Sequence, residues 1–348
     1  MKTAAAIFVI AALLAGVAPA SGADSLPTVL DDASFWRFIT GLSEPDGWFR
    51  YENLLSNETS YQVVIPTLRK ITSAGDVYIG VGPEQNFTYI AALEPKMAFI
   101  VDIRRQNMLE LLIYKALFEL STDRAEFASQ LFSRRRPAGV DPTSTAQDLF
   151  KAYEAQNCDT GLLRQTQQRV NDRLTRFHAF PLSDEDQGVI KHVLQTFCSG
   201  GPQIDYGFTN APSNLVAPSY SELMTADDGR GQNWSYLANE ENFGRIREMQ
   251  MKNLIVPLTG NFAGMMTLRA IGTYLKRHNA TVTAFYVSNV EQYLNTDQVV
   301  RFRNNVALLP ITASSVLIRF IPPESTVLEP VREFLWNRGS LFHLLKKE

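Results

Sequence analysis

The sequence predicts an α/β fold with an open, mostly parallel sheet that is interrupted by a helical insertion. Three observations favour this class. A strand–turn–helix–strand pattern occupies 76–105, the same alternation returns between 254 and 321, and residues 120–200 show helical spacing without a strand pattern. Strand–helix alternation on both sides of a helical segment is typical of one sheet that is split along the chain.

Length and composition allow a substantial core. The chain has 348 residues, of which 45% are hydrophobic, enough for one large domain or two small ones. Its 33 basic and 36 acidic side chains nearly balance, so no nucleic-acid partner is predicted. The four histidines are scattered without metal-ligand spacing, and G-x-S-x-G and phosphate-loop motifs are missing from the sequence, so no metal site is predicted.

The N-terminus has the pattern of a secretory signal peptide. Lys2 precedes an uncharged apolar run, Ala4 to Ala18, and small residues follow as far as Ala23. We therefore predict a signal peptide over 1–23, export to the periplasm or the medium, and no transmembrane segment in the mature chain. An uncleaved N-terminal anchor is the alternative.

The rest of the chain divides into three parts. Residues 24–119 hold a helical lead-in and the first half of the sheet, 120–200 form the insertion, and 201–348 hold a loop-rich segment and the second half of the sheet. In the lead-in we predict helices at 31–42 and 61–73, the second capped by Ser60. After the insertion we predict strands at 232–237, 254–258, 282–287 and 315–321.

Two cysteines, Cys158 and Cys198, flank a predicted helical stretch of the insertion. Export would place them in an oxidising compartment, so we predict that they form a disulfide. A catalytic cysteine is the weaker alternative, because neither lies in a Cys-x-x-Cys pattern or beside a histidine.

The strongest functional pattern is the glycine turn in the first βαβ unit. Gly80 and Gly82 follow a short apolar strand, and Pro83 and Glu84 suit the first turn of a helix. Asp102 ends the next predicted strand, about 20 residues after the turn. Glycines let the backbone approach a bulky ligand, and an acid at this place accepts the hydroxyls of a ribose.

The third glycine of the dinucleotide fingerprint is replaced by Gln85. This departure disfavours a pyrophosphate and favours an adenosine without phosphates. A nicotinamide-dependent oxidoreductase is therefore the weaker enzyme alternative. An ordinary βαβ unit, whose glycines only serve the turn, is the structural alternative.

This unit resembles motif I of class I S-adenosylmethionine-dependent methyltransferases, which have a Rossmann-like fold. The resemblance implies S-adenosylmethionine as cofactor, held by Gly80, Gly82, Pro83, Glu84, Gln85, Asn86, Asp102, Ile103 and Arg104. Residues 43–62, 77–107 and 281–294 also resemble a set of uncharacterised, often exported bacterial proteins with such a fold. That second resemblance implies the fold and carries no activity.

Other residues are expected at the same sheet edge. Asn289 lies at the position from which such methyltransferases orient the methyl acceptor. Glu291 or Glu58 would serve as a general base if burial raised its pKa. Asn57 and Glu58 form a candidate lid, while Tyr220 and Asn261 are candidate substrate contacts. For each of these residues, the alternative is a structural role in a loop, in which the side chain only hydrogen-bonds to the local backbone.

Two functions follow from these patterns. The first is a methyltransferase with an unknown acceptor. The second is a non-catalytic exported protein that uses the same fold to hold a small molecule or a component of the cell envelope. Export favours the second, because the methyl donor is made in the cytoplasm.

Overall fold

The computed structural model describes residues 25–72, 77–208, 217–321 and 325–336. The predicted signal peptide, 1–23, lies outside the described residues. Within them, the helices are all too short or too polar to cross a bilayer.

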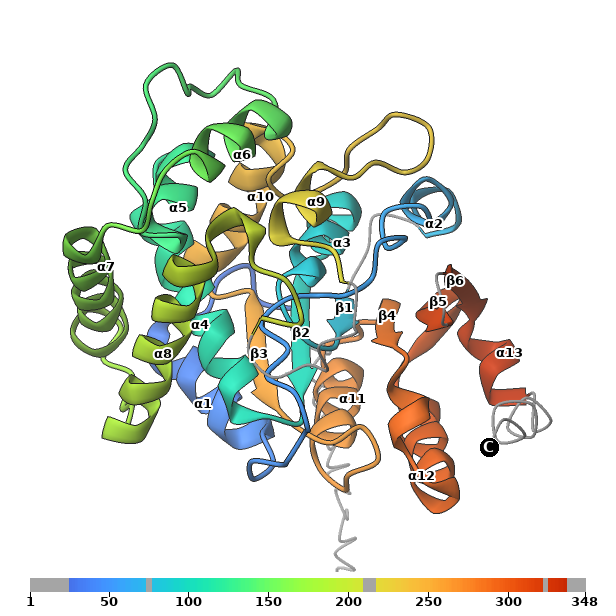
Figure 1. Cartoon of the computed structure of the whole chain (residues 1–348). Helices are drawn as coiled ribbons and strands as arrows, with labels where there is room; N and C mark the ends of the chain where they lie inside the picture. The colour runs from blue at the N-terminus through green and yellow to red at the C-terminus, as the bar shows by residue number, and fades with distance from the viewer. Residues whose placement is uncertain (1–24, 73–76, 209–216, 322–324, 337–348) are drawn as a thin grey trace, which may run out of the picture.

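A six-stranded sheet forms the centre of the fold, with the strands in the order β3-β2-β1-β4-β5-β6 (Figure 1). Neighbouring strands are parallel except β5 and β6, which are antiparallel. The strands are β1 (Val77–Gly80), β2 (Met97–Asp102), β3 (Ile255–Thr259), β4 (Val282–Ser288), β5 (Ile311–Ile321) and β6 (Ser325–Pro330). The predicted α/β class and mostly parallel, Rossmann-like sheet are therefore confirmed.

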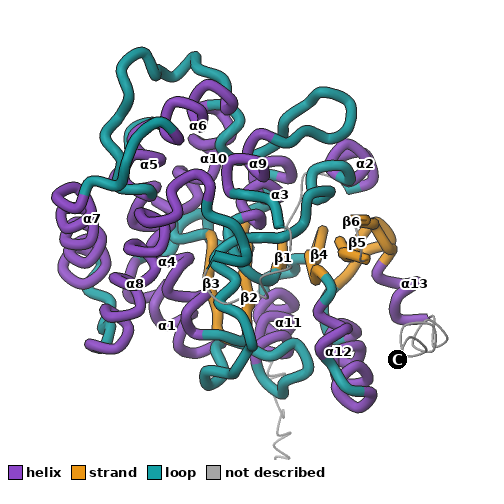
Figure 2. The backbone as a smooth tube through the Cα atoms, viewed as in Figure 1, coloured by secondary structure: helices purple, strands orange, loops and turns teal. Residues whose placement is uncertain are grey.

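The crossover helices cover both faces of this sheet (Figure 2). The chain moves from β1 to β2 and β3 in one direction, and from β4 to β5 in the other. Right-handed crossovers therefore place α3 and α12 on opposite faces. These helices and their neighbours are α1 (Asp32–Leu42), α2 (Ile65–Ile71), α3 (Gln85–Leu93), α4 (Arg105–Leu120), α10 (Glu240–Met251), α11 (Thr267–Arg277), α12 (Thr296–Ala307) and α13 (Val331–Trp336).

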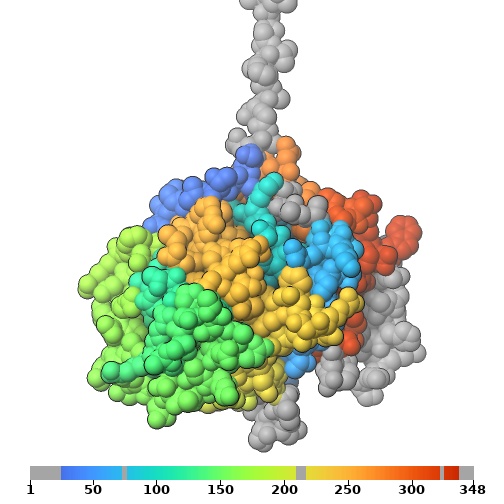
Figure 3. Space-filling view, turned by 90° about the horizontal axis from the view of Figure 1, so that it is seen from above, coloured from blue at the N-terminus to red at the C-terminus, as the bar shows by residue number. Residues whose placement is uncertain are grey.

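The insertion is helical, and it lies between β2 and β3. Figure 3 shows it on the opposite side of the molecule from the C-terminal elements β5, β6 and α13. A π-helical turn, Arg173–Phe177, continues its third helix. The helices between α4 and α10 are α5 (Arg124–Leu131), α6 (Ala146–Glu154), α7 (Thr160–Asp172), α8 (Asp184–Gly200) and α9 (Tyr220–Thr225).

The strand predicted at 232–237 is wrong, because this segment forms turns that lead into α10. Side chains take the backbone groups that a strand would need for its ladder. The backbone N–H of Trp234 donates to Gln62 Oε1 at 2.6 Å, and that of Ser235 donates to Asn233 Oδ1 at 2.8 Å. The second bond is local, and local side-chain bonds of this kind compete with sheet pairing.

The predicted cap at Ser60 is also wrong. Helix α2 begins at Ile65, and Val64 precedes it without a side-chain cap. The Ser60 hydroxyl instead accepts the backbone N–H of Thr326 at 2.9 Å. Thr326 belongs to β6, a strand that the sequence pattern did not predict, so Ser60 ties the lead-in to the edge of the sheet.

The predicted disulfide between Cys158 and Cys198 is confirmed, with the two Cα atoms 5.3 Å apart. It joins the segment before α7 to the last turn of α8. The insertion is therefore stapled across one helical hairpin.

Replacing both cysteines with serine is expected to lower the free energy of unfolding by about 3–4 kcal/mol, because the bridge restricts the unfolded chain. Urea unfolding followed by circular dichroism measures this. Wild-type protein in excess reductant is the control and should unfold at the same urea concentration as the double variant. Coincident curves for the oxidised protein and the variant would contradict a stabilising bridge.

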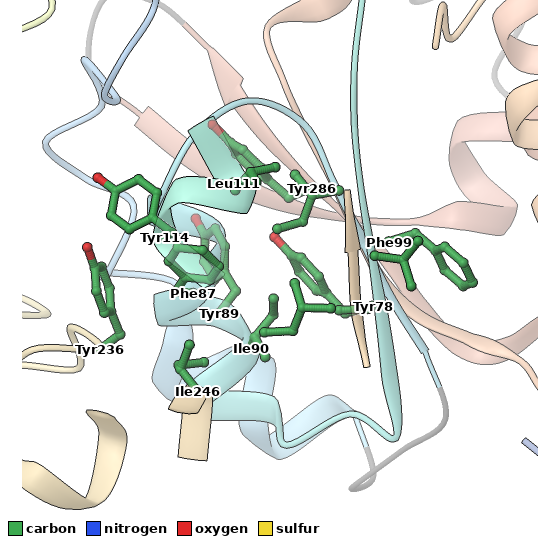
Figure 4. Packing of buried hydrophobic residues seen from close by; sticks show 14 of the residues in the cluster. Tyr78, Phe87, Tyr89, Ile90, Phe99, Leu111, Tyr114, Tyr236, Ile246 and Tyr286 are labelled. Carbon is green, nitrogen blue, oxygen red and sulfur yellow. The ribbon is translucent and has the colours of Figure 1, made fainter. Parts of the chain in front are cut away.

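The core around β1 and α3 is rich in tyrosine (Figure 4). The rings of Tyr78 and Tyr286 each pack near Tyr89, with centroid distances of 6.2 Å and 5.4 Å. Buried tyrosine hydroxyls need partners, and the Tyr89 hydroxyl donates to the carbonyl of Tyr61 at 3.0 Å. This packing fixes the first strand and helix relative to β4, on which the site below depends.

Candidate functional site

A pocket of about 470 Å³ opens at the carboxyl ends of β1, β2, β3 and β4. Strands β1 and β4 are neighbours from which the chain moves in opposite directions, so this is the topological switch point where open α/β sheets bind ligands. We call it the switch-point pocket. Most of its wall comes from five separate segments, within 48–58, 81–85, 101–103, 260–262 and 286–294.

A second cavity of about 280 Å³ lies at the opposite end of the strands, near the amino ends of β2 and β3. Its lining includes Lys96 and Leu254, which precede β2 and β3. Ligands of such sheets bind at the carboxyl ends of the strands, so the switch-point pocket is the candidate site.

The two glycines after β1 are required for different reasons. Gly82 has φ of +77°, a conformation that favours glycine, and a Cβ there would meet no atom within 4 Å. Its backbone therefore borders open space in the pocket. Gly80 is packed tightly, since a Cβ would lie 1.9 Å from Asn86 Oδ1.

Asn86 holds the glycine turn from behind. Its Nδ2 donates to the carbonyls of Val81 and Pro83 at 2.9 and 2.7 Å, and its Oδ1 accepts the Tyr78 hydroxyl at 2.8 Å. The side chain is fully buried and does not line the pocket. Asn86, predicted as a cofactor contact, thus shapes the turn rather than facing a ligand.

Asp102 lies at the predicted place, at the end of β2 and in the pocket wall. Its carboxylate is bound by Arg104, with Nε 3.0 Å from Oδ1 and Nη2 3.1 Å from Oδ2. The Arg104 backbone N–H also donates to Oδ1 at 2.9 Å. Each carboxylate oxygen can accept two hydrogen bonds, so Oδ2 keeps one acceptor position.

Glu58 is the acid that faces the pocket from the lead-in loop. It is 1% exposed, and its Oε1 accepts hydrogen bonds from the hydroxyls of Tyr286, at 2.7 Å, and Ser288. Burial raises the pKa of Glu58 to about 7, against the opposing effect of hydrogen bonds from Ser288, Tyr286 and Gln85. A carboxyl with such a pKa can both take and give a proton at neutral pH.

Among the described residues, three buried polar atoms of the pocket lining lack a well-formed hydrogen bond: Asn53 Oδ1, Glu58 Oε2 and Gln85 Nε2. The last two belong to side chains that interact with each other. Leaving such an atom unpaired costs about 1–3 kcal/mol. A ligand that offers one donor and one acceptor would remove part of this cost. No sequence pattern pointed to Asn53, whose φ of +48° belongs to an irregular loop.

The structure separates the remaining candidates. Asn57, Asn261, Asn289, Pro83 and Ile103 line the pocket. The Asn261 side chain also serves its own turn, since Oδ1 accepts the backbone N–H of Ala263 at 2.8 Å.

Three more predicted residues lie outside the pocket lining. The Glu291 carboxylate is paired with Arg319 of β5, so it is not available as a base. Tyr220 is fully buried, and its hydroxyl bonds that of Tyr236 instead of facing the pocket. Glu84 is fully buried behind the pocket lining, with no side-chain partner among the described residues.

Sequence reasoning missed most aromatic residues of the pocket. Phe49, Tyr206, Phe262 and Tyr293 all line it, alongside Tyr286. The cluster of aromatics at 48–51 was a usable signal. Tyr206 was not predictable, because it follows the insertion and reaches the site only through the fold, where its ring lies 5.8 Å from that of Tyr51.

Comparison with known proteins identifies the family. A comparison with curated proteins found no match. A family model described as a domain of unknown function (DUF7790) matches residues 54–347, which include all six strands and most segments of the pocket. Because this match covers most of its length, the chain belongs to the DUF7790 family.

Proposed function

We propose that this protein binds S-adenosylmethionine in the switch-point pocket and transfers its methyl group to a small acceptor. One observation carries the proposal. The pocket brings together the open backbone of Gly82, the carboxylate of Asp102 and an acid of pKa about 7, Glu58.

The residues fit such a ligand in their chemistry. The bare backbone at Gly82 leaves room for a bulky group, and the free acceptor position on Asp102 Oδ2 suits a ribose hydroxyl. S-adenosylmethionine, when bound, would supply a methyl group that is already activated, so the chain needs mainly to bind and orient the partners.

Glu58 would act as the general base. Its carboxyl is held by Tyr286, Ser288 and Gln85, and Oε2 would take the proton of the acceptor. Near neutral pH about half of the Glu58 carboxyls are ionised, because the pKa is about 7. Proton removal by this group would therefore increase between pH 6 and pH 8.

The engagement of Asp102 favours a second candidate, a binding protein without catalysis. Both Asp102 oxygens already accept bonds from Arg104, which leaves less for a ribose than a free carboxylate would. Under this candidate the same pocket holds another small molecule. Export through the predicted signal peptide would also favour it.

Calorimetric titration with S-adenosylmethionine and S-adenosylhomocysteine tests the proposal. We expect saturable binding in about the micromolar range. Val81→Trp places a bulky side chain in the pocket wall and should abolish binding. Val300→Trp is the matched control, because Val300 is exposed on α12 outside the pocket lining, and it should bind like the wild type.

Glu58→Gln keeps the shape of the side chain, so it should retain binding while losing the ionisable group. Absence of heat with both ligands, for a wild-type chain shown to be folded by circular dichroism, would contradict the methyltransferase. The binding protein would then be the better description.

A further inference from the structure

The mouth of the switch-point pocket carries exposed aromatic rings. Trp48 is 82% exposed and Tyr293 is 43% exposed, although both line the pocket. The ring of Phe49 lies edge-on to that of Tyr293, with centroids 5.0 Å apart. Large rings that stay in water at a pocket mouth offer apolar faces on which a ligand can stack.

Arg50 orients this rim. Its guanidinium carbon lies 5.9 Å from the ring centroid of Tyr293 and 5.6 Å from that of Tyr51. Such cation–π contacts hold a ring in place. Arg50 is also the one cationic residue of the described pocket lining, so this lining can pair with one anionic group of a ligand.

The polar lining is dominated by neutral amides. In the lining, Asn57 and Gln292 are exposed, Asn53, Asn289 and Gln298 are half-buried, and Gln85 is buried. An amide donates and accepts, as does a hydroxyl, so the two match without a charge. The charged lining residues besides Arg50 are Glu58 and Asp102, and Arg104 neutralises the latter.

We infer that the mouth of the switch-point pocket binds a neutral saccharide, which stacks on Trp48 and Tyr293 and hydrogen-bonds to the surrounding amides. A pyranose presents a C–H face and a rim of hydroxyls, the two chemistries that this wall complements. A saccharide with several phosphate or carboxylate groups would need more cations than Arg50, the one cation of the described lining.

This saccharide is the acceptor of the proposed methyl transfer, and in that respect the inference rests on the proposed function. A sugar hydroxyl would form a bond to the methyl carbon as the carbon–sulfur bond of S-adenosylmethionine breaks. The hydroxyl proton would pass to Glu58 Oε2, and the products would be a methyl ether and S-adenosylhomocysteine.

Titration of the full chain with cellotriose, maltotriose and triacetylchitotriose, each with and without saturating S-adenosylhomocysteine, tests the inference. We expect at least one of them to bind with a Kd of about 1 mM or tighter. Trp48→Ala should weaken that binding about tenfold, as expected for losing one stacked ring. Trp336→Ala is the matched control, because Trp336 is 88% exposed on α13 and outside the pocket lining.

The outcomes separate the two proposals. Saccharide binding that needs Trp48, without any binding of S-adenosylhomocysteine, supports the saccharide site and contradicts the methyltransferase. Binding of S-adenosylhomocysteine without any of the three saccharides overturns the inference and leaves the proposed function. Equal loss in both tryptophan variants, or none in Trp48→Ala, also overturns it, since the rim would then not be the binding surface.

Discussion

Gly80→Ala is expected to lower the free energy of unfolding by about 3–5 kcal/mol. A Cβ at this position would lie 1.9 Å from Asn86 Oδ1 and 2.9 Å from a ring carbon of Tyr78, so the Asn86 side chain must move. That movement breaks its bonds to the turn carbonyls and to the Tyr78 hydroxyl, all in the core. The turn that borders the pocket would lose its shape as well.

Urea unfolding measures the loss, and two other glycines serve as controls. Gly188 lies exposed within α8, and a Cβ there would meet no atom within 4 Å, so Gly188→Ala should stabilise the chain by about 0.5–1 kcal/mol. In Gly82→Ala the added Cβ would meet no atom within 4 Å, but alanine would have to adopt a positive φ. This should lower the free energy of unfolding by about 1–2 kcal/mol. A Gly80→Ala protein as stable as the wild type would contradict the packing described for Asn86.

The second large effect concerns buried acids, and it appears as a dependence of stability on pH. Glu84 is fully buried, and burial raises its pKa from the ordinary value of 4.5 to about 8, against the opposing effect of backbone hydrogen bonds from Glu84 and Ser56. Glu110 on α4 is buried in the same way, and burial together with the nearby Glu84 raises its pKa strongly. Glu84 is therefore mostly neutral in the folded chain at pH 7.

The sign follows from proton binding. Between pH 4.5 and 8 the folded chain keeps the Glu84 proton while the unfolded chain releases it, so stability falls as the pH rises. The contribution is fully present below about pH 4.5 and is lost as the pH passes through about 8. For Glu84 the loss is on the order of 3–5 kcal/mol.

Glu84→Gln is expected to flatten this dependence, because glutamine has no proton to release. The free energy of unfolding measured in urea at pH 5, 7 and 9 would then differ less in the variant than in the wild type. Glu241→Gln is the matched control, since the Glu241 side chain is 74% exposed, and it should follow the wild type. Parallel pH profiles for Glu84→Gln and the wild type would rule out the assigned burial.

Local patterns predicted much of the fold. The apolar run before Gly80 and the run that ends at Asp102 are strands in the structure, because their side chains alone favour a buried parallel sheet. The pairing of Cys158 and Cys198 was also predictable, since the chain has two cysteines. The class of the sheet followed from strand–helix alternation.

The site was predictable only in outline. The glycine turn and Asp102 lie where the sequence spacing placed them. The spacing does not reveal that Arg104 pairs with the Asp102 carboxylate, or that the Asn86 side chain bonds the turn instead of lining the pocket. Glu58 depends on residues 228 and 230 positions away, because Tyr286 and Ser288 hold it. These roles depend on contacts between residues that are far apart in the chain, and a single sequence does not show which residues come into contact.

The place of Glu58 has a further consequence. This side chain belongs to a loop that precedes the whole sheet, yet it acquires its shifted pKa only by lying against the end of β4. Any movement that returned the loop to water would restore an ordinary acidity, so docking of the loop between pH 4.5 and 7 must draw a proton from solution. Acidity of the medium and closure of the pocket are thereby thermodynamically linked through one carboxyl.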